Sequence, residues 1–267
     1  MAWSNFDTRK YTLTAWISLK SRFAYRAELA GPLLTYGLFV WIFSLIWSVA
    51  YSGRGELAGY SRFEVTWYFA VAELMTFLGG GFFHGLSEEI KSGQIAYTLS
   101  RPYSFLWFQF SQNIGPALVQ LPVLFPLGYL ICTLTVGPWI PINPVQILFL
   151  GLSVLLTLAL HFFLQACLSL AAFWVEETIA FFWIYQKLFL VTGTLMPLEF
   201  LPDWAVRILI WTPLPYLSWA TGKMFVHFEL RQSLEILGMQ ILWTCLGALG
   251  AFFLFRLGVR RTLMQGG

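Results

Sequence analysis

Long apolar runs dominate the pattern of hydrophobic and polar positions. A transmembrane helix needs about 20 apolar residues, and six stretches approach or exceed that length, at 32–51, 65–86, 114–136, 145–173, 178–196 and 234–255. The pattern predicts an all-α polytopic membrane protein in which a six-span bundle covers 31–257, after a segment at 1–30 and before a tail at 258–267. These spans leave no room for a separate soluble catalytic domain, so we expect one transmembrane domain.

The segment before the first span has the pattern of an amphipathic helix. One helical face collects its apolar residues, and Arg22 and Arg26 point the other way; the apolar residues are Leu13, Trp16, Ile17, Phe23, Ala24 and Ala27. We expect this helix to lie on the cytoplasmic membrane surface, with Lys20 extending from the apolar face to water. A solvated tail is the alternative. The first apolar run starts only after Gly31, which is too late for a cleaved signal peptide.

Basic residues favour the cytoplasmic side of membrane proteins. An even number of spans places both termini on one side, and that side has twice as many basic residues as the other. The two sets are Arg9, Lys10, Lys20, Arg22, Arg26, Lys91, Arg101, Arg256, Arg260 and Arg261 against Arg54, Arg62, Arg207, Lys223 and Arg231. Both termini are therefore predicted to be cytoplasmic.

The loop between the second and third spans predicts a short surface helix. Ser87 is a suitable N-cap, and Glu88 and Glu89 follow in the first turn, where the helix dipole favours acidic residues. Gly93 interrupts this helix, and the pair Arg101-Pro102 ends the segment, because proline disfavours helix at the preceding residue.

The segment between the fifth and sixth spans is apolar but broken by Pro197, Pro202, Pro213 and Pro215. Proline does not fit in a helix interior, so we expect short re-entrant or interfacial helices that form an outer hairpin. In the alternative, 205–228 forms a seventh span and places the C-terminus outside. The prolines and Lys223 argue against that alternative.

Composition supports membrane insertion and excludes several functions. Of the 267 residues, 58% are hydrophobic, 19% are aromatic and only 11% are charged, against about 25% charged in ordinary soluble domains. The net charge of +3 comes from scattered residues, so nucleic acid is not an expected partner. The three cysteines lie singly in apolar runs and predict neither a disulfide framework nor a metal site.

Motifs for enzymatic chemistry are not found in the sequence. Its one Gly-Lys pair, Gly222-Lys223, lacks the upstream glycine and the following hydroxyl residue of a phosphate-binding loop. The sequence also lacks the His-Glu-x-x-His and Gly-x-Ser-x-Gly patterns of metalloproteases and serine hydrolases. We therefore predict that the chain is not itself an ATPase or another enzyme.

Three ionisable residues fall near the middle of predicted spans, where charge is costly: Glu73, His161 and Lys187. They could line a path for substrate or protons, or Glu73 and Lys187 could form a structural ion pair. His161 lies one turn from Gln165 and is expected to be a hydrogen-bonded packing residue. Gly79-Gly80-Gly81, at the inner end of the second span, predicts close helix packing or a bend.

The order of these parts resembles the membrane subunit, or permease, of an ABC-2 type exporter, in its small form without a fused ATPase. The acidic cytoplasmic segment carries one part of the resemblance, with Glu88-Glu89-Ile90-Lys91-Ser92-Gly93-Gln94-Ile95 and Leu99-Ser100-Arg101-Pro102. The outer loop carries the other, with Pro197-Leu198-Glu199-Phe200-Leu201-Pro202 ahead of Pro213 and Pro215.

The resemblance implies a division of labour in the bacterial inner membrane. Two permease chains, identical or paralogous, would form the export pathway in the bilayer, and two separate ABC ATPase subunits would drive it. ATP and Mg²⁺ would bind to those subunits, with no cofactor on this chain. By position, the coupling residues that contact the ATPase would be Glu88, Glu89, Ile90, Lys91, Gly93 and Arg101.

Two other readings remain open. A proton- or ion-coupled secondary transporter would use Glu73, Lys187 or His161 in a relay, but the chain shows no inverted repeat. A hydrolase embedded in the membrane would need a catalytic cluster, and the sequence shows no motif for one.

Overall fold

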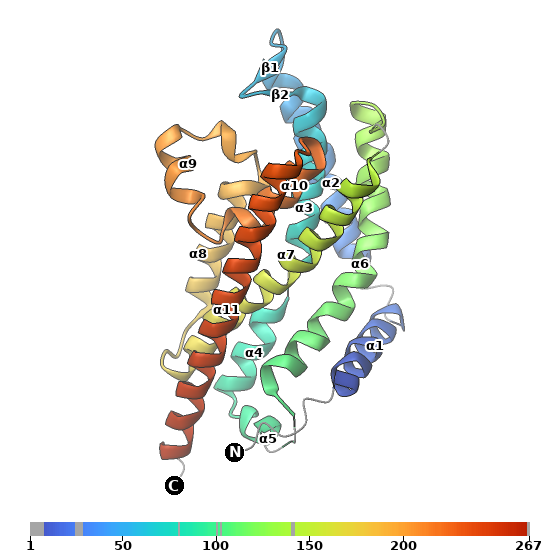
Figure 1. Cartoon of the computed structure of the whole chain (residues 1–267). Coiled ribbons are helices and arrows are strands. Elements are labelled where there is room, and N and C mark those ends of the chain that lie inside the picture. Colours follow the sequence, from blue (N-terminus) through green and yellow to red (C-terminus); the bar gives the residue numbers. More distant parts are fainter. Residues whose placement is uncertain are drawn as a thin grey trace.

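The computed structural model of the chain describes residues 8–24, 29–79, 81–99, 101, 103–139 and 142–265. Its helices form an elongated bundle (Figure 1). They are α1 (Thr8–Ala24), α2 (Ala30–Ala50), α3 (Arg62–Leu78), α4 (Phe82–Lys91), α5 (Ile95–Leu99), α6 (Phe105–Thr135), α7 (Pro144–Leu170), α8 (Ile179–Phe189), α9 (Asp203–Leu209), α10 (Trp219–Val226) and α11 (Leu230–Gln265). A two-stranded hairpin, β1 (Glu56–Leu57) and β2 (Tyr60–Ser61), lies at one end of the bundle, and α5 lies at the other.

Five segments of the described chain are long and apolar enough to cross a membrane: Ala30–Ala50, Arg62–Lys91, Phe105–Thr135, Pro144–Phe173 and Leu230–Arg261. They correspond to five of the six predicted spans. The sixth prediction, at 178–196, coincides with the shorter apolar helix Ile179–Thr194, in which α8 continues as a π-helical turn. The chain is thus an all-α polytopic membrane protein, and the crossing of α8 stays a prediction.

The second predicted span is broken by its glycines. α3 ends at Leu78, and α4 begins at Phe82, directly after Gly81, whose φ of 108° is the left-handed conformation that favours glycine. Gly80 lies outside the described residues. The prediction that Ser87 caps a new helix is therefore wrong: α4 starts five residues earlier, because Gly81 allows the turn and the bundle buries the side chains that follow it. Glu88 and Glu89 consequently lie near the end of α4, and Gly93 follows that end, as predicted.

The predicted N-terminal helix is present as α1, which lies beside α6 (Figure 1). Leu13, Trp16 and Ile17 are exposed on α1, at 50%, 53% and 65%, so its apolar face is turned away from the bundle. The Lys20 ammonium lies 5.2 Å from the centre of the Trp16 ring, a cation–π contact on that face. The predicted positions from Arg22 to Ala27 lie outside the described side chains.

The opposite face of α1 packs very closely on α6. A Cβ atom added to Gly115 of α6 would lie 2.8 Å from the Ala15 carbonyl oxygen and 2.8 Å from the Leu19 backbone nitrogen. Glycine at this position therefore lets the two helix backbones approach, as small residues do in membrane helix packing.

The segment after α8 is divided into short helices, as its prolines predict. Two 3₁₀ turns, Leu198–Phe200 and Pro215–Leu217, alternate with α9 and α10. The alternative of a seventh span at 205–228 is wrong, since the helix that ends at Leu209 and the one that begins at Trp219 are both too short to cross a bilayer.

We predict that Gly115→Ala lowers the free energy of unfolding by about 1–3 kcal/mol, because the added methyl group has to displace the α1 backbone. The apparent melting temperature of the purified protein in detergent measures the effect. Gly151→Ala is the matched control, because Gly151 also lies in a long helix and a Cβ atom there would meet no atom within 4 Å. Equal melting temperatures for the two variants would contradict the close α1–α6 contact.

Candidate functional site

The predicted coupling residues gather at one end of the bundle, on α4 and α5 and directly after them. Glu88, Lys91, Gly93 and Arg101 are exposed, and the Arg101 guanidinium lies 5.0 Å from the centre of the Tyr97 ring. Ser100 and Pro102 of the same motif lie outside the described residues. The exposed residues give this end of the bundle a charged surface.

The other two predicted coupling residues are engaged within the chain. Glu89 accepts a hydrogen bond from the Thr98 hydroxyl and another, of 2.9 Å, from the Gln109 side-chain amide. Its carboxylate thereby joins α4 to α5 and α6. Ile90 is 9% exposed and packs in the core with Leu86 and Ile95. Glu89 and Ile90 therefore hold the segment in place, and Glu88 and Lys91 face outward.

A second set of contacts ties α4 to the start of α8. The Ser87 and Thr178 hydroxyl oxygens are 2.9 Å apart in a buried hydrogen bond, and the Phe83 and Phe182 rings stack with centres 4.3 Å apart. On the surface, the Lys91 ammonium lies 3.2 Å from Glu177 Oε1. We call these three contacts the α4–α8 clasp. Nothing in the sequence spacing indicated it, because its two sides are about 90 residues apart.

Glu177 also helps to begin α8. Its Oε1 atom accepts a 3.1 Å hydrogen bond from the Ile179 backbone N–H. That hydrogen bond, with the neighbouring Lys91 ammonium, lowers the pKa of the Glu177 carboxyl. A negative charge is therefore favoured at the N-terminus of α8, where the helix dipole also favours it.

The ion pair suggested for Glu73 and Lys187 does not form among the described residues. Glu73 is buried on α3, and its Oε2 atom has no hydrogen-bond partner there. Lys187 is exposed on α8. The alternative in which Glu73 and Lys187 form a structural ion pair is therefore wrong.

His161 lies in a hydrogen-bonded cluster at the break between α3 and α4. Its Nδ1 atom is 2.9 Å from the Tyr185 hydroxyl, and the Gln165 side-chain amide donates a 2.6 Å hydrogen bond to the Gly79 carbonyl. A Cβ atom on Gly79 would lie only 2.5 Å from the His161 ring. A cavity of about 180 Å³ adjoins this cluster and reaches Lys187.

The predicted outer loop is organised by Glu199. Its Oε1 atom lies 2.8 Å from the Lys223 ammonium, and its Oε2 atom accepts hydrogen bonds of 3.2 Å each from the Tyr60 hydroxyl and the Trp219 indole N–H. Burial alone would raise the pKa of the Glu199 carboxyl, but the charge and hydrogen bond of Lys223, together with other hydrogen bonds, lower it overall. This network joins the β hairpin, the outer loop and α10.

The prolines of that loop lie at its turns. Pro197 and Pro202 immediately precede the Leu198–Phe200 turn and α9, and Pro215 opens the next 3₁₀ turn, two residues after Pro213. The sequence indicated Glu199 and the prolines. It did not indicate Tyr60, which lies 139 residues away and carries no motif.

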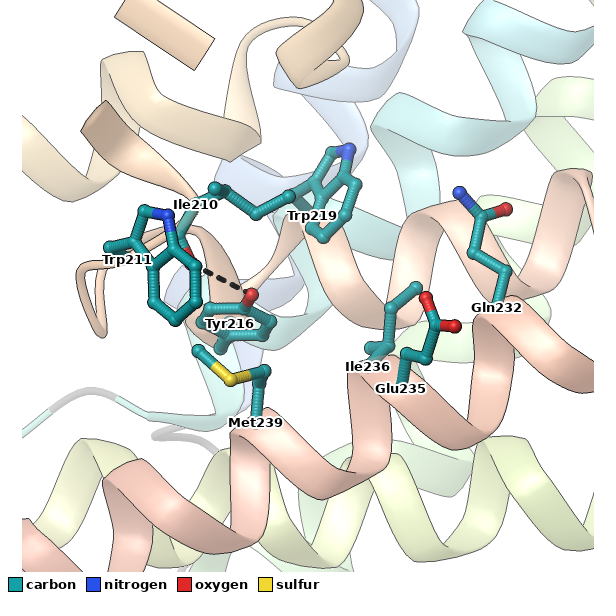
Figure 2. Close-up of a pocket in the computed structure, with 8 residues that line it drawn as sticks. All are labelled: Ile210, Trp211, Tyr216, Trp219, Gln232, Glu235, Ile236 and Met239. Atoms are coloured by element: carbon teal, nitrogen blue, oxygen red, sulfur yellow. Dashed lines mark hydrogen bonds between the residues drawn. The ribbon is translucent and has the colours of Figure 1, made fainter. Parts of the chain in front are cut away.

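A pocket of about 200 Å³ lies between this outer segment and the start of α11 (Figure 2). Its walls combine aromatic, aliphatic and polar side chains from both sides, namely Ile210, Trp211, Tyr216, Trp219, Gln232, Glu235, Ile236 and Met239. We call it the outer aromatic pocket. Among the described residues, no group of three or more His, Cys, Asp or Glu side chains is placed to hold a metal ion.

Comparison with models of protein families matches residues 38–266 to the family described as ABC-2 family transporter protein. The match begins within α2 and includes every later described element through α11. No curated protein and no solved structure matches the chain.

Glu199 and Lys223 should behave as a coupled pair. Glu199→Gln leaves the mostly buried Lys223 charge without its partner, so we expect a loss of about 1–3 kcal/mol in unfolding free energy. This loss is smaller than that for a fully buried pair, because part of Glu199 is exposed. The double variant Glu199→Gln with Lys223→Met should lose less than the sum of the single losses. Thermal unfolding measures all three variants, with exposed Glu229→Gln as the control.

The pH dependence gives an independent check on this pair. A carboxyl whose pKa is lowered stabilises the fold above its ordinary value of 4.5, and this contribution is lost as the pH falls through the lowered value. The difference in stability between the unsubstituted protein and Glu199→Gln should therefore shrink below pH 4.5. Additive single losses, or a difference that does not change with pH, would contradict the pairing.

Proposed function

Because the chain belongs to the ABC-2 transporter family, we propose that it is the permease of an exporter in which separate ATPase subunits drive transport. The family assigns it to the membrane permeases of ABC transporters. The observation that most directly supports a separate ATPase is the charged surface of α4 and α5, which presents Glu88, Lys91 and Arg101 at one end of the bundle. ATP and Mg²⁺ then bind to the partner subunits, and this chain supplies the transmembrane path.

In this proposal the end of the bundle with α4 and α5 is cytoplasmic, and two ATPase subunits dock there. The basic residues of the chain favour this orientation, which also places both termini in the cytoplasm. α1 then lies beside the docking surface, with its exposed apolar face against the inner leaflet of the bacterial inner membrane. The β hairpin and the outer aromatic pocket face the opposite side.

The α4–α8 clasp gives ATPase motion a mechanical route into the membrane. Glycines separate α4 from α3, so α4 can move relative to α3, and the clasp fixes α4 to α8. A rigid-body shift of the docking surface would therefore move α8 with it. ATP favours such a shift only if the ATPase dimer binds the shifted state more tightly.

A second permease chain, identical or paralogous, would cover the exposed face of α8. This face carries Phe181, Ile184 and Leu188 together with Lys187. A lysine at the bilayer centre costs about 2.5–3.5 kcal/mol on insertion scales, so this face is better placed at a subunit interface or a water-filled path than against lipid. If it were α-helical throughout, Ile179–Thr194 would extend over about 24 Å at 1.5 Å per residue, which is close to the thickness of the hydrocarbon core and supports this segment as the fifth of six proposed spans.

Affinity purification in mild detergent tests the proposed assembly. We expect the chain to recover stoichiometric amounts of a subunit that has a phosphate-binding loop, together with one further permease chain. Glu88→Lys should lose the ATPase subunit, because it reverses a charge on the docking surface, and Glu229→Lys on the outer side should retain it. Mass spectrometry identifies the recovered chains.

A chain that repeatedly purifies alone, under conditions that preserve a known ABC complex, would contradict the proposal. Retention of the ATPase by Glu88→Lys would instead contradict only the position of the docking surface. The two failures are therefore distinguishable.

If the α4–α8 clasp transmits motion, substitutions in its Lys91–Glu177 ion pair should have non-additive effects on the movement of α8. Spin labels on exposed Val49 of α2 and Val191, just after α8, should report an ATP-dependent distance change in the purified complex. Lys91→Met and Glu177→Gln should each reduce this change, and the double variant should reduce it no further, because either substitution already breaks the same contact.

Folding should be unaffected by these variants, because an exposed ion pair contributes only about 0–1 kcal/mol. Lys10→Met on α1 removes an exposed lysine outside the clasp and is the matched control. If all three clasp variants showed the same distance change as the unsubstituted complex, this pair would have no role in transmitting ATPase motion to α8.

A further inference from the structure

The outer aromatic pocket has the composition of a cation site. Three aromatic side chains line it, those of Trp211, Tyr216 and Trp219, together with Ile236 and Met239 (Figure 2). Aromatic faces carry negative partial charge and attract cations, and several of them around one space favour an alkylated ammonium group. The pocket lies between the outer segment and α11, away from the docking surface.

Hydrogen bonds fix two of the three aromatic walls. The Tyr216 hydroxyl donates a 2.9 Å hydrogen bond to the Ile210 carbonyl, drawn as the dashed line in Figure 2. The Trp219 indole N–H is bound to Glu199, behind the pocket wall. The two rings stand 6.1 Å apart at 81° to each other. A ligand would therefore meet two walls that are already in place, which lowers the entropic cost of binding.

The charge of the lining also selects a cation. Among the described residues that line the pocket, Glu235 is the one with a charge, and Gln232 is its polar neighbour on the same helix. Arg231 lies outside the lining, with its guanidinium 3.4 Å from Glu235 Oε1, and both side chains are highly exposed, at 88% and 67%. Such an exposed pair is weak, so a cation held by the aromatic walls can replace the guanidinium.

The surroundings favour an amphiphile over a small ion. A pocket of about 200 Å³ is smaller than the roughly 300–1,000 Å³ of sites for drug-sized ligands, so it holds a head group only. Apolar side chains of the lining itself, Ile210, Ile236 and Met239, offer a surface for the start of a hydrocarbon chain.

We infer that the outer aromatic pocket binds the quaternary ammonium head of an amphiphile, with Trp211, Tyr216 and Trp219 around the head and Glu235 as its counter-charge. The inference does not depend on ATPase docking, because the residues that define the pocket all belong to this chain.

Binding to the purified permease in nanodiscs tests this site without ATP or partner subunits. The nanodiscs contain phosphatidylethanolamine and phosphatidylglycerol, neither of which has a quaternary ammonium group, and the probe is radiolabelled octyltrimethylammonium. We expect saturable binding that unlabelled octyltrimethylammonium competes fully and tetramethylammonium competes only weakly. Octyl sulfate and octyl glucoside should not compete, because they offer the same chain with an anionic or neutral head.

Variants separate the pocket from general partitioning into the membrane. Trp211→Ala and Glu235→Gln should each weaken binding about threefold to tenfold, and Arg231→Gln should strengthen it by freeing Glu235. Trp204→Ala is the matched control, because Trp204 is equally exposed on the outer segment, at 69% against 71% for Trp211, and does not line the pocket. Since all four side chains are exposed, melting temperatures should stay within a few degrees of the unsubstituted protein.

Three results would overturn the inference. Equal competition by octyl sulfate or octyl glucoside would show a site for the hydrocarbon chain alone. Competition by tetramethylammonium as strong as that by the octyl compound would show a small-cation site without a chain. Equal affinities for Trp211→Ala and Trp204→Ala, or no saturable component, would show that the pocket is not the site.

Discussion

The break between α3 and α4 is the feature on which the rest of the fold depends. A helix that stops inside a bilayer leaves backbone carbonyls without partners, at a cost of several kcal/mol each unless the protein supplies them. Here the Gln165 side-chain amide donates a hydrogen bond to the Gly79 carbonyl and so provides one such partner. The His161 ring occupies the space that a side chain at Gly79 would fill. Glycine and two polar residues of α7 together make the break stable.

That break divides one predicted span into two helices with different contacts. Above it, α3 packs with α2, α6 and α10 in the core of the bundle. Below it, α4 carries the exposed charges and is bound to the start of α8 by the α4–α8 clasp. One continuous helix would force the end of the bundle with α4 and its core to move together. In the proposed assembly, the glycines would let α4 follow an ATPase subunit and α3 would retain the packing of the core.

The sequence predicted those features that depend on local chemistry. Apolar length located five of the six predicted spans, proline located the turns of the outer segment, and glycine located the break and the end of α4. It failed where a contact joins distant segments. Ser87 resembles an N-cap locally, yet its hydroxyl is used by Thr178 across the bundle. Similar depth in the membrane suggested Glu73 and Lys187 as partners. The largely buried lysine that does pair with a carboxylate is Lys223, and its partner is Glu199. Depth in the membrane does not specify the direction in which a side chain points.

The same long-range contacts connect the two ends of the molecule through α8. After α8 the chain turns at Gly193, whose carbonyl accepts a hydrogen bond from the Tyr68 hydroxyl. A Cβ atom at Gly193 would lie 2.8 Å from the Cβ atom of Trp219, so this turn rests directly on a wall of the outer aromatic pocket. Trp219 in turn is held by Glu199. A displacement of α8 that begins at the clasp would therefore press on the pocket wall, because close-packed contacts transmit displacement instead of absorbing it. In the proposed assembly, α8 would therefore link the docking surface on α4 and α5 to the outer aromatic pocket.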